Sequence, residues 1–126
     1  MATVKEFGAL RFSDTAGEKS EVCCPPYDII SPEQKKAYLN TNENNIIRLE
    51  LPEQSEAGYN LAGQTLKNWV DSGILKQDEE DCLYIYEEKF AVKGVNYSFK
   101  GFVARVKLHP FSDGVVLPHE ETLSKA

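Results

Sequence analysis

The residues best suited to chemistry lie at the end of the chain, in the stretch LPHEETLSK. We expect residues 115–117 to form a strand that leads into a helix. The first turn of that helix would present free backbone N–H groups and the positive end of its dipole, which suits phosphate. The side chains expected to bind the phosphate are those of four residues: His119, Thr122, Arg105 and Lys107. Glu120, in the same turn, could act as a catalytic carboxylate or hold magnesium.

A simpler interpretation of this stretch stays open. Acidic residues in a first turn commonly do no more than stabilise the helix, and Glu120 and Glu121 would repel an anion unless a magnesium ion lay between them. The stretch also lacks the second histidine of the HExxH zinc-protease pattern. The sequence therefore does not identify a metal.

A second candidate for chemistry is Asp28, which PPYDIIS places between a proline pair and two isoleucines. A carboxylate with apolar neighbours can act as a general base, so Asp28 is the candidate base of a phosphotransfer site. Asp28 could equally cap a turn or the helix that follows it.

Two helices are expected to help position these residues. Ser31, followed by Pro, Glu and Gln34, forms a capping box and predicts a helix that runs to about Asn40. A second helix should begin near Ser55 and end at Gly73, with an apolar stripe that faces the core. The stripe consists of Tyr59, Ala62, Leu66, Trp69 and Val70.

Short strands are predicted in FGALRF and in NIIRLEL, while the prolines of VCCPPY restrict that segment to a sheet edge or a rigid crossing. Residues 83–92 and 97–108 are expected to form a long antiparallel hairpin around the turn KGVN, with either a bulge at Glu87-Glu88 or a strand that extends past the sheet there. The return arm should end in basic residues. Its apolar side is expected to consist of Phe102, Ala104, Val106 and Leu108.

These elements predict an α+β fold with a mixed, mainly antiparallel sheet, two main helices and a long β-hairpin. The chain has 126 residues, 41% hydrophobic and 27% charged, which suffices for one globular domain. No apolar run approaches the roughly 18 residues of a membrane span. Lys5 and Glu6 interrupt any apolar region of a signal peptide. We therefore expect no membrane contact and a cytoplasmic protein.

The net charge of −6 is unevenly distributed. Residues 1–82 hold 8 Lys and Arg against 15 Asp and Glu, whereas residues 83–126 hold 6 against 5. Neither a basic recognition helix nor a basic arm is visible, so DNA binding is not expected. Cys23, Cys24 and Cys82 lack the spacing of a zinc site and are expected to be reduced and buried.

Several motifs, in their order along the chain, are similar to those of a known family. They are PPYDIIS, NIIRLELP, LKNWVDSGIL, LYIYEEKF, GFVARVKL and LPHEETLSK. In this order they resemble the N-terminal part of the large prokaryotic family of unknown function numbered 1015. Members of that family are longer, so the resemblance implies that this chain is the N-terminal part of a longer protein. Labels that liken some members to ParB imply a ParB/sulfiredoxin-like fold, in which a phosphate-binding element follows a strand and begins a helix.

Two functional hypotheses follow. The resemblance and the C-terminal stretch favour a nucleotide-binding or phosphotransferase-like domain, such as a small-molecule kinase, which would use ATP or ADP with magnesium and be inactive as a fragment. The alternative is a noncatalytic regulatory or protein-interaction domain that self-associates through the long hairpin. In favour of the alternative, the aromatic residues of the hairpin exceed what one face of a small sheet buries: Tyr84, Tyr86, Phe90, Tyr97 and Phe99.

Overall fold

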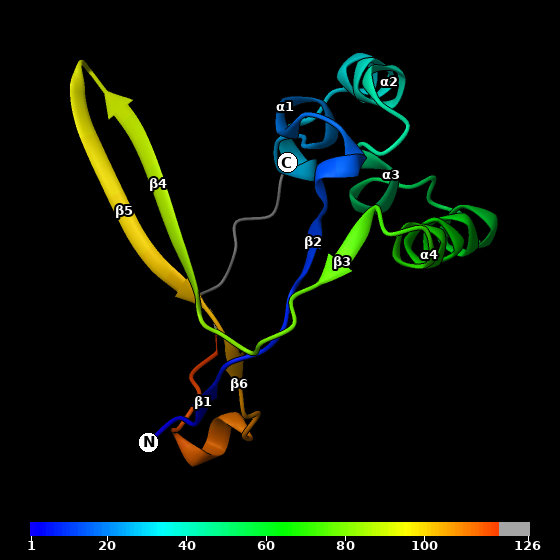
Figure 1. The fold of residues 1–126 in the computed structure, drawn as a ribbon. Helices are drawn as coiled ribbons and strands as arrows, with labels where there is room; N and C mark the ends of the chain where they lie inside the picture. Colours follow the sequence, from blue (N-terminus) through cyan, green and yellow to red (C-terminus); the bar gives the residue numbers. More distant parts are fainter. Residues whose placement is uncertain (119–126) are drawn as a thin grey trace. The chain divides into compact units, whose positions relative to one another are not determined.

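The computed structural model describes residues 1–118 of the chain. The described residues form three two-stranded antiparallel sheets and four α-helices, which confirms the predicted α+β class (Figure 1). The chain divides into two compact units, one of Leu10–Asp78 and one of Met1–Ala9 together with the chain from Glu79 onward. That the chain acts as a single domain stays a prediction. None of the helices within the described part is long and apolar enough to cross a lipid bilayer.

The Leu10–Asp78 unit contains the helices. Its two main helices are α2, Pro32–Thr41, and α4, Glu56–Asp71. The capping box at the start of α2 is confirmed, because the Ser31 hydroxyl accepts from Gln34 N while the Gln34 side chain accepts from Ser31 N. At the other end of the unit, Gly73 takes a left-handed φ of 77° just beyond α4, as its predicted role requires.

The remaining elements of this unit are short. They are β2 (Leu10–Phe12), η1 (Asp14–Ala16), α1 (Lys19–Val22), η2 (Tyr27–Ile29), α3 (Ile47–Glu50) and β3 (Leu75–Gln77). The strands β2 and β3 pair antiparallel, with Phe12 opposite Leu75. The FGALRF segment therefore forms a strand only in its second half.

The strand predicted for NIIRLEL is wrong, because this segment forms the helix α3. The reason lies in Asn45, which is fully buried. Its side-chain Oδ1 accepts a hydrogen bond from Ile47 N at 3.0 Å, which supplies the partner that the first turn of a helix lacks. The alternation of apolar residues favours a strand, but the hydrogen bond from Ile47 N to the Asn45 side chain favours a helix, and the helix forms.

The core lies in the Leu10–Asp78 unit and is small. Among the described residues, the buried hydrophobic side chains are Ala16, Val22, Ile47, Trp69 and Leu75. Trp69 packs against Phe12 with ring centroids 5.7 Å apart. The prediction that the whole apolar stripe of α4 faces the core is wrong: Trp69 is 6% exposed, but Tyr59 is 58% exposed.

The second unit is built from strands. They are β1 (Val4–Lys5), β4 (Tyr84–Val92), β5 (Val95–Val103) and β6 (Arg105–Val106), followed by the turn η3 (Phe111–Asp113). The predicted hairpin is confirmed as β4 and β5 (Figure 1). Its turn is shorter than the predicted KGVN, because Val95 and Asn96 already pair with β4, and the two remaining residues, Lys93 and Gly94, have positive φ, as a type I′ turn requires. The bulge predicted at Glu87-Glu88 is wrong, since both residues pair in uninterrupted register. Residues 115–117 form no strand.

The return arm changes its partner after Val103. Up to that residue β5 pairs with β4, whereas β6 pairs with β1, with Lys5 opposite Arg105. The predicted apolar side of this arm is therefore also wrong. Phe102 lies opposite Ile85, on the face of the hairpin that carries its charged pairs, and the apolar face is the other one.

Candidate functional site

The structure distributes the predicted site residues over both units. Asp28 lies in η2 of the Leu10–Asp78 unit, where it is exposed. Arg105 and Lys107 lie in the other unit, on β6 and directly after it. Three further predicted residues, His119, Glu120 and Thr122, lie outside the described residues. The structure therefore brings together Arg105 and Lys107. Whether all six predicted site residues form one site stays a prediction.

Arg105 and Lys107 belong to a basic face on the β1–β6 pair. Lys5 is paired with Arg105, and Lys107 N donates to the carbonyl oxygen of Thr3 at 3.0 Å. Because side chains alternate along a strand, these four residues share one face of the pair. They line a hollow of about 340 Å³. Thr3 and Lys5 could not be predicted as members of this face, because only the pairing of β1 with β6 places them here.

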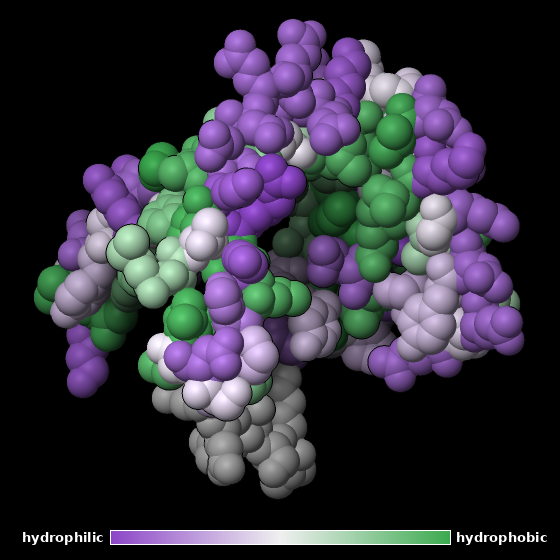
Figure 2. All heavy atoms as spheres, turned by 90° about the horizontal axis from the view of Figure 1, so that it is seen from below, coloured by the Kyte–Doolittle hydropathy of each residue, from purple (hydrophilic) through white to green (hydrophobic). Residues whose placement is uncertain are grey.

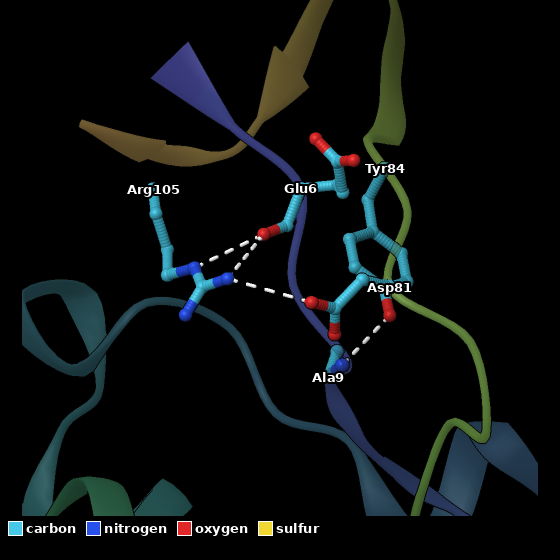
Figure 3. Close-up of polar contacts among 5 residues, drawn as sticks. All are labelled: Glu6, Ala9, Asp81, Tyr84 and Arg105. Atoms are coloured by element: carbon cyan, nitrogen blue, oxygen red, sulfur yellow. Dashed lines mark hydrogen bonds and ion pairs between the residues drawn. The ribbon is translucent and has the colours of Figure 1, made fainter. Parts of the chain in front are cut away.

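Figure 3 shows that the Arg105 guanidinium already forms hydrogen bonds within the protein. Its Nε and Nη2 donate to the carbonyl oxygen of Glu6 at 3.0 and 2.7 Å, and Nη2 also lies 3.4 Å from the Asp81 carboxylate. Arg105 thus fastens the segment after β1 to β6. The positive charges of Lys5 and Lys107 have no ion pair among residues 1–118. The two lysines are therefore the freer cations of this face.

Tyr84 fastens the base of the hairpin in the same unit. Its hydroxyl accepts a hydrogen bond from Ala9 N at 2.7 Å (Figure 3). Its ring packs on that of Phe7 at a centroid distance of 5.1 Å, and Phe7 is bridged to Cys82 by two backbone hydrogen bonds. These contacts hold the first residue of β4, but they do not extend along the hairpin.

The long hairpin has two chemically different faces. Cross-strand pairs place all five aromatic residues named in the sequence analysis on one face, here called the aromatic face. This face consists of Tyr84, Tyr86, Glu88, Phe90, Val92, Val95, Tyr97, Phe99, Gly101 and Val103. The rings of Phe90 and Tyr97 stack across it at 5.6 Å. Seven of its side chains, all except those of Tyr84, Glu88 and Gly101, are between 45% and 59% exposed.

The opposite face of the hairpin is mainly polar and satisfies its own charges. Glu87 lies at its centre, accepts a hydrogen bond from Ser98 at 3.0 Å and lies 3.5 and 3.7 Å from the ammonium groups of Lys89 and Lys100. The polar centre of this face suits contact with water, whereas its apolar pair Ile85 and Phe102 is 78% and 61% exposed. The difference between the two faces follows from the register, which places Glu87 and Glu88 on opposite sides.

Glu88 is the one charged residue of the aromatic face. One of its oxygens accepts a hydrogen bond from the Tyr86 hydroxyl at 3.2 Å. That bond, together with the negative charge of Glu88, raises the pKa of Tyr86, so the hydroxyl remains a donor at neutral pH. The sequence did not reveal that Glu88 has aromatic neighbours on this face, because the register that gives it these neighbours comes from the strand pairing.

A hollow of about 580 Å³ in the other unit is lined by residues of α2, α3 and α4. Arg48 lines it, but its guanidinium donates to the carbonyl oxygens of Leu39 and Glu43 at 2.9 and 2.8 Å. These bonds satisfy carbonyl groups around the end of α2, which is a structural role. Arg48 is thus committed to structure, but Lys35 and Glu53 also line the hollow, and neither forms an ion pair among residues 1–118.

The three cysteines form no disulfide. All three are free, as expected, but Cys23 and Cys82 are exposed and Cys24 is half-buried, so their predicted burial is wrong. Burial, and then the charges of Glu50 and Cys23, raise the pKa of the Cys24 thiol, which disfavours the nucleophilic thiolate. Within residues 1–118, no cluster of three His, Cys, Asp or Glu residues could hold a metal ion.

Comparison with known proteins identifies a family and nothing closer. The family described as "Protein of unknown function (DUF1015)" matches residues 4–126, which is nearly the whole chain. No curated protein and no solved structure matched the chain. A ParB/sulfiredoxin-like fold therefore stays a prediction.

Proposed function

Since this chain belongs to DUF1015, a family of proteins of unknown function, we propose that the part described here is a protein-interaction domain. Its docking surface is the aromatic face of the β4–β5 hairpin. The observation that carries this proposal is the exposure of seven apolar side chains on one face of a single hairpin. Figure 2 shows apolar residues at the molecular surface between the polar ones.

The size of the exposed face supports docking. Aromatic side chains present about 150–250 Å² each, so seven half-exposed aromatic and valine side chains leave on the order of 600 Å² open. The largest apolar patch of a typical monomer is about 300–600 Å². One partner in a standard interface buries about 800 Å². The exposed apolar area of the aromatic face is therefore at the upper end of what a monomer without a partner shows, and it is large enough for the centre of an interface.

The stability of the hairpin gives a second argument. A two-stranded hairpin alone is marginally stable in water, because one pair of strands buries little apolar surface. Among the described residues neither β4 nor β5 pairs with a further strand. A partner that covered the aromatic face would bury the stacked rings of Phe90 and Tyr97 and would stabilise the hairpin in its extended form.

The experiment compares two matched double variants. Phe90→Ser with Tyr97→Ser removes a cross-strand apolar pair from the aromatic face, while Ile85→Ser with Phe102→Ser removes one from the opposite face. The probe is a labelled nine-residue peptide that alternates apolar and polar residues, with norleucine at its centre, and binding is followed by fluorescence anisotropy. We expect the first variant to weaken binding about tenfold, since it loses roughly 1.4 kcal/mol of apolar contact, and the second to bind like the parent chain. Equal weakening by both variants, or no binding to the parent chain, would contradict the proposal.

Phosphate or nucleotide binding is a second candidate function, favoured by the basic face of Thr3, Lys5, Arg105 and Lys107. Like charges directly opposite each other on a strand pair are destabilising, so Lys5 beside Arg105 would gain from an anion. His119 and Thr122 are proposed to add donors, and Glu120 to act as a catalytic carboxylate if ATP or ADP with magnesium is the ligand. Asp28, which lies in the other unit, stays the predicted base. Phosphotransferase activity is part of this candidate.

Calorimetric titration tests this candidate with inorganic phosphate and with magnesium ATP. We expect Lys5→Ala to weaken binding about fivefold to tenfold, because one phosphate contact is lost, and Lys36→Ala, an exposed lysine of α2, to leave it unchanged. Equal effects of the two substitutions would show only a general charge effect. His119→Ala separates the contribution of the C-terminal stretch from that of the basic face.

A further inference from the structure

The aromatic face carries one charged group at its centre. Along β4, Glu88 lies between Tyr86 and Phe90, and across the hairpin it lies opposite Phe99. The diagonal neighbours of Glu88 are Tyr97 and Gly101, so four rings and one position without a side chain surround the carboxylate. The face contains no cation, because the lysines of both strands, Lys89 and Lys100, lie on the other side of the hairpin.

The hydrogen bonds of Glu88 leave it able to bind a cation. The Tyr86 hydroxyl donates to Oε2, and Glu88 forms no ion pair among the described residues. Its sequence neighbour Glu87 differs in this respect, since it lies near two lysines and accepts from Ser98. The hairpin therefore neutralises Glu87 with its own lysines. Glu88, whose neighbours on the aromatic face are aromatic residues, is left to interact with a binding partner.

Covering this face with a purely apolar surface would be unfavourable. A carboxylate that loses water needs a counter-charge or further hydrogen bonds. Two copies of the hairpin placed face to face would enclose two Glu88 carboxylates and bring no cation from this face. A cationic side chain, in contrast, would gain both from the carboxylate and from the quadrupoles of the surrounding rings.

We infer that the aromatic face binds a polypeptide segment with an apolar surface and a central lysine or arginine, whose cation is placed on Glu88 among the rings of Tyr86, Phe90 and Phe99. This inference rests on the proposed function and specifies its partner. The apolar side chains supply contact area, and Glu88 supplies selectivity for the charge. Self-association through this face is correspondingly disfavoured at neutral pH.

The test uses three peptides that differ only at the central residue of their apolar side, which is lysine, norleucine or glutamate. Each is an alternating nine-residue strand with an ethylene glycol tail for solubility, titrated against the whole chain. We expect the lysine peptide to bind about fivefold more tightly than the norleucine peptide, and the glutamate peptide to bind most weakly. Glu88→Gln should abolish the preference for lysine over norleucine. Glu87→Gln, which removes the same charge from the opposite face, should retain it.

The outcomes separate this inference from the proposed function. If the norleucine peptide binds to the aromatic face and lysine brings no gain, the inference fails while the proposed function stands. If no peptide binds, both fail. Sedimentation velocity gives an independent readout: Glu88→Gln should raise any self-association of the chain and Glu87→Gln should not. If the parent chain and the Glu88→Gln variant dimerised equally strongly through the aromatic face, the inference would be overturned.

Discussion

Replacing Asn45 with aspartate is expected to destabilise the Leu10–Asp78 unit by about 3 kcal/mol, although the two side chains have nearly the same size. Asn45 is fully buried, and its Nδ2 donates to the carbonyl oxygens of Glu21 at 2.6 Å and Cys23 at 3.2 Å. Aspartate places an oxygen against these two acceptors, so two half-buried carbonyl groups lose their partner and a charge is added at a buried position. The side-chain link between the end of α1 and the start of α3 is thereby lost, and only the backbone hydrogen bond from Ile46 N to the carbonyl oxygen of Val22 still joins them.

Urea unfolding followed by far-UV circular dichroism measures this loss, because all four helices of the described chain lie in this unit. Asn45→Ala should cost a similar amount, since it also removes the acceptor of Ile47 N. Asn60→Asp, at an exposed position of α4, is the matched control and should change the free energy of unfolding by less than about 0.5 kcal/mol. A normal midpoint for Asn45→Asp would show that these hydrogen bonds do not hold the unit together.

Two glycines of α4 should respond to alanine in opposite directions. Gly58→Ala is expected to destabilise the same unit by about 2–3 kcal/mol, because a Cβ there would overlap the carbonyl oxygen of Glu53 and force the start of the helix to move. Gly58 is buried, and its N–H donates to the capping hydroxyl of Ser55 at 3.1 Å, so that movement would also disturb the cap.

Gly63→Ala provides the control in the same helix. A Cβ at Gly63 meets no atom within 4 Å, so alanine should stabilise the unit by about 0.5–1 kcal/mol through its higher helix propensity. Thermal unfolding of both variants, recorded beside the parent chain, checks the opposite signs. If both substitutions were stabilising, the close approach of Glu53 to the first turn of α4 would be disproved.

Features that depend on neighbouring residues could be predicted from the sequence. Ser31 and Gln34 satisfy backbone groups within one turn of each other, so the start of α2 needs no distant contact. The Lys93-Gly94 turn fixes the register of the hairpin by its own geometry. With that register, the alternation of side chains along two strands places the aromatic residues on one face.

Features that depend on distant partners were decided by the tertiary structure. NIIRLEL forms a helix because Asn45 joins it to α1, more than 20 residues earlier in the chain. The return arm leaves β4 because β1 offers a second edge, and that pairing alone brings Lys5 beside Arg105. The sequence by itself determined the local caps, the turn and the family. Only the tertiary structure showed which polar groups hold the fold together and which are left for binding. The reason is that a hydrogen bond between distant segments leaves no periodic pattern in the sequence of either segment.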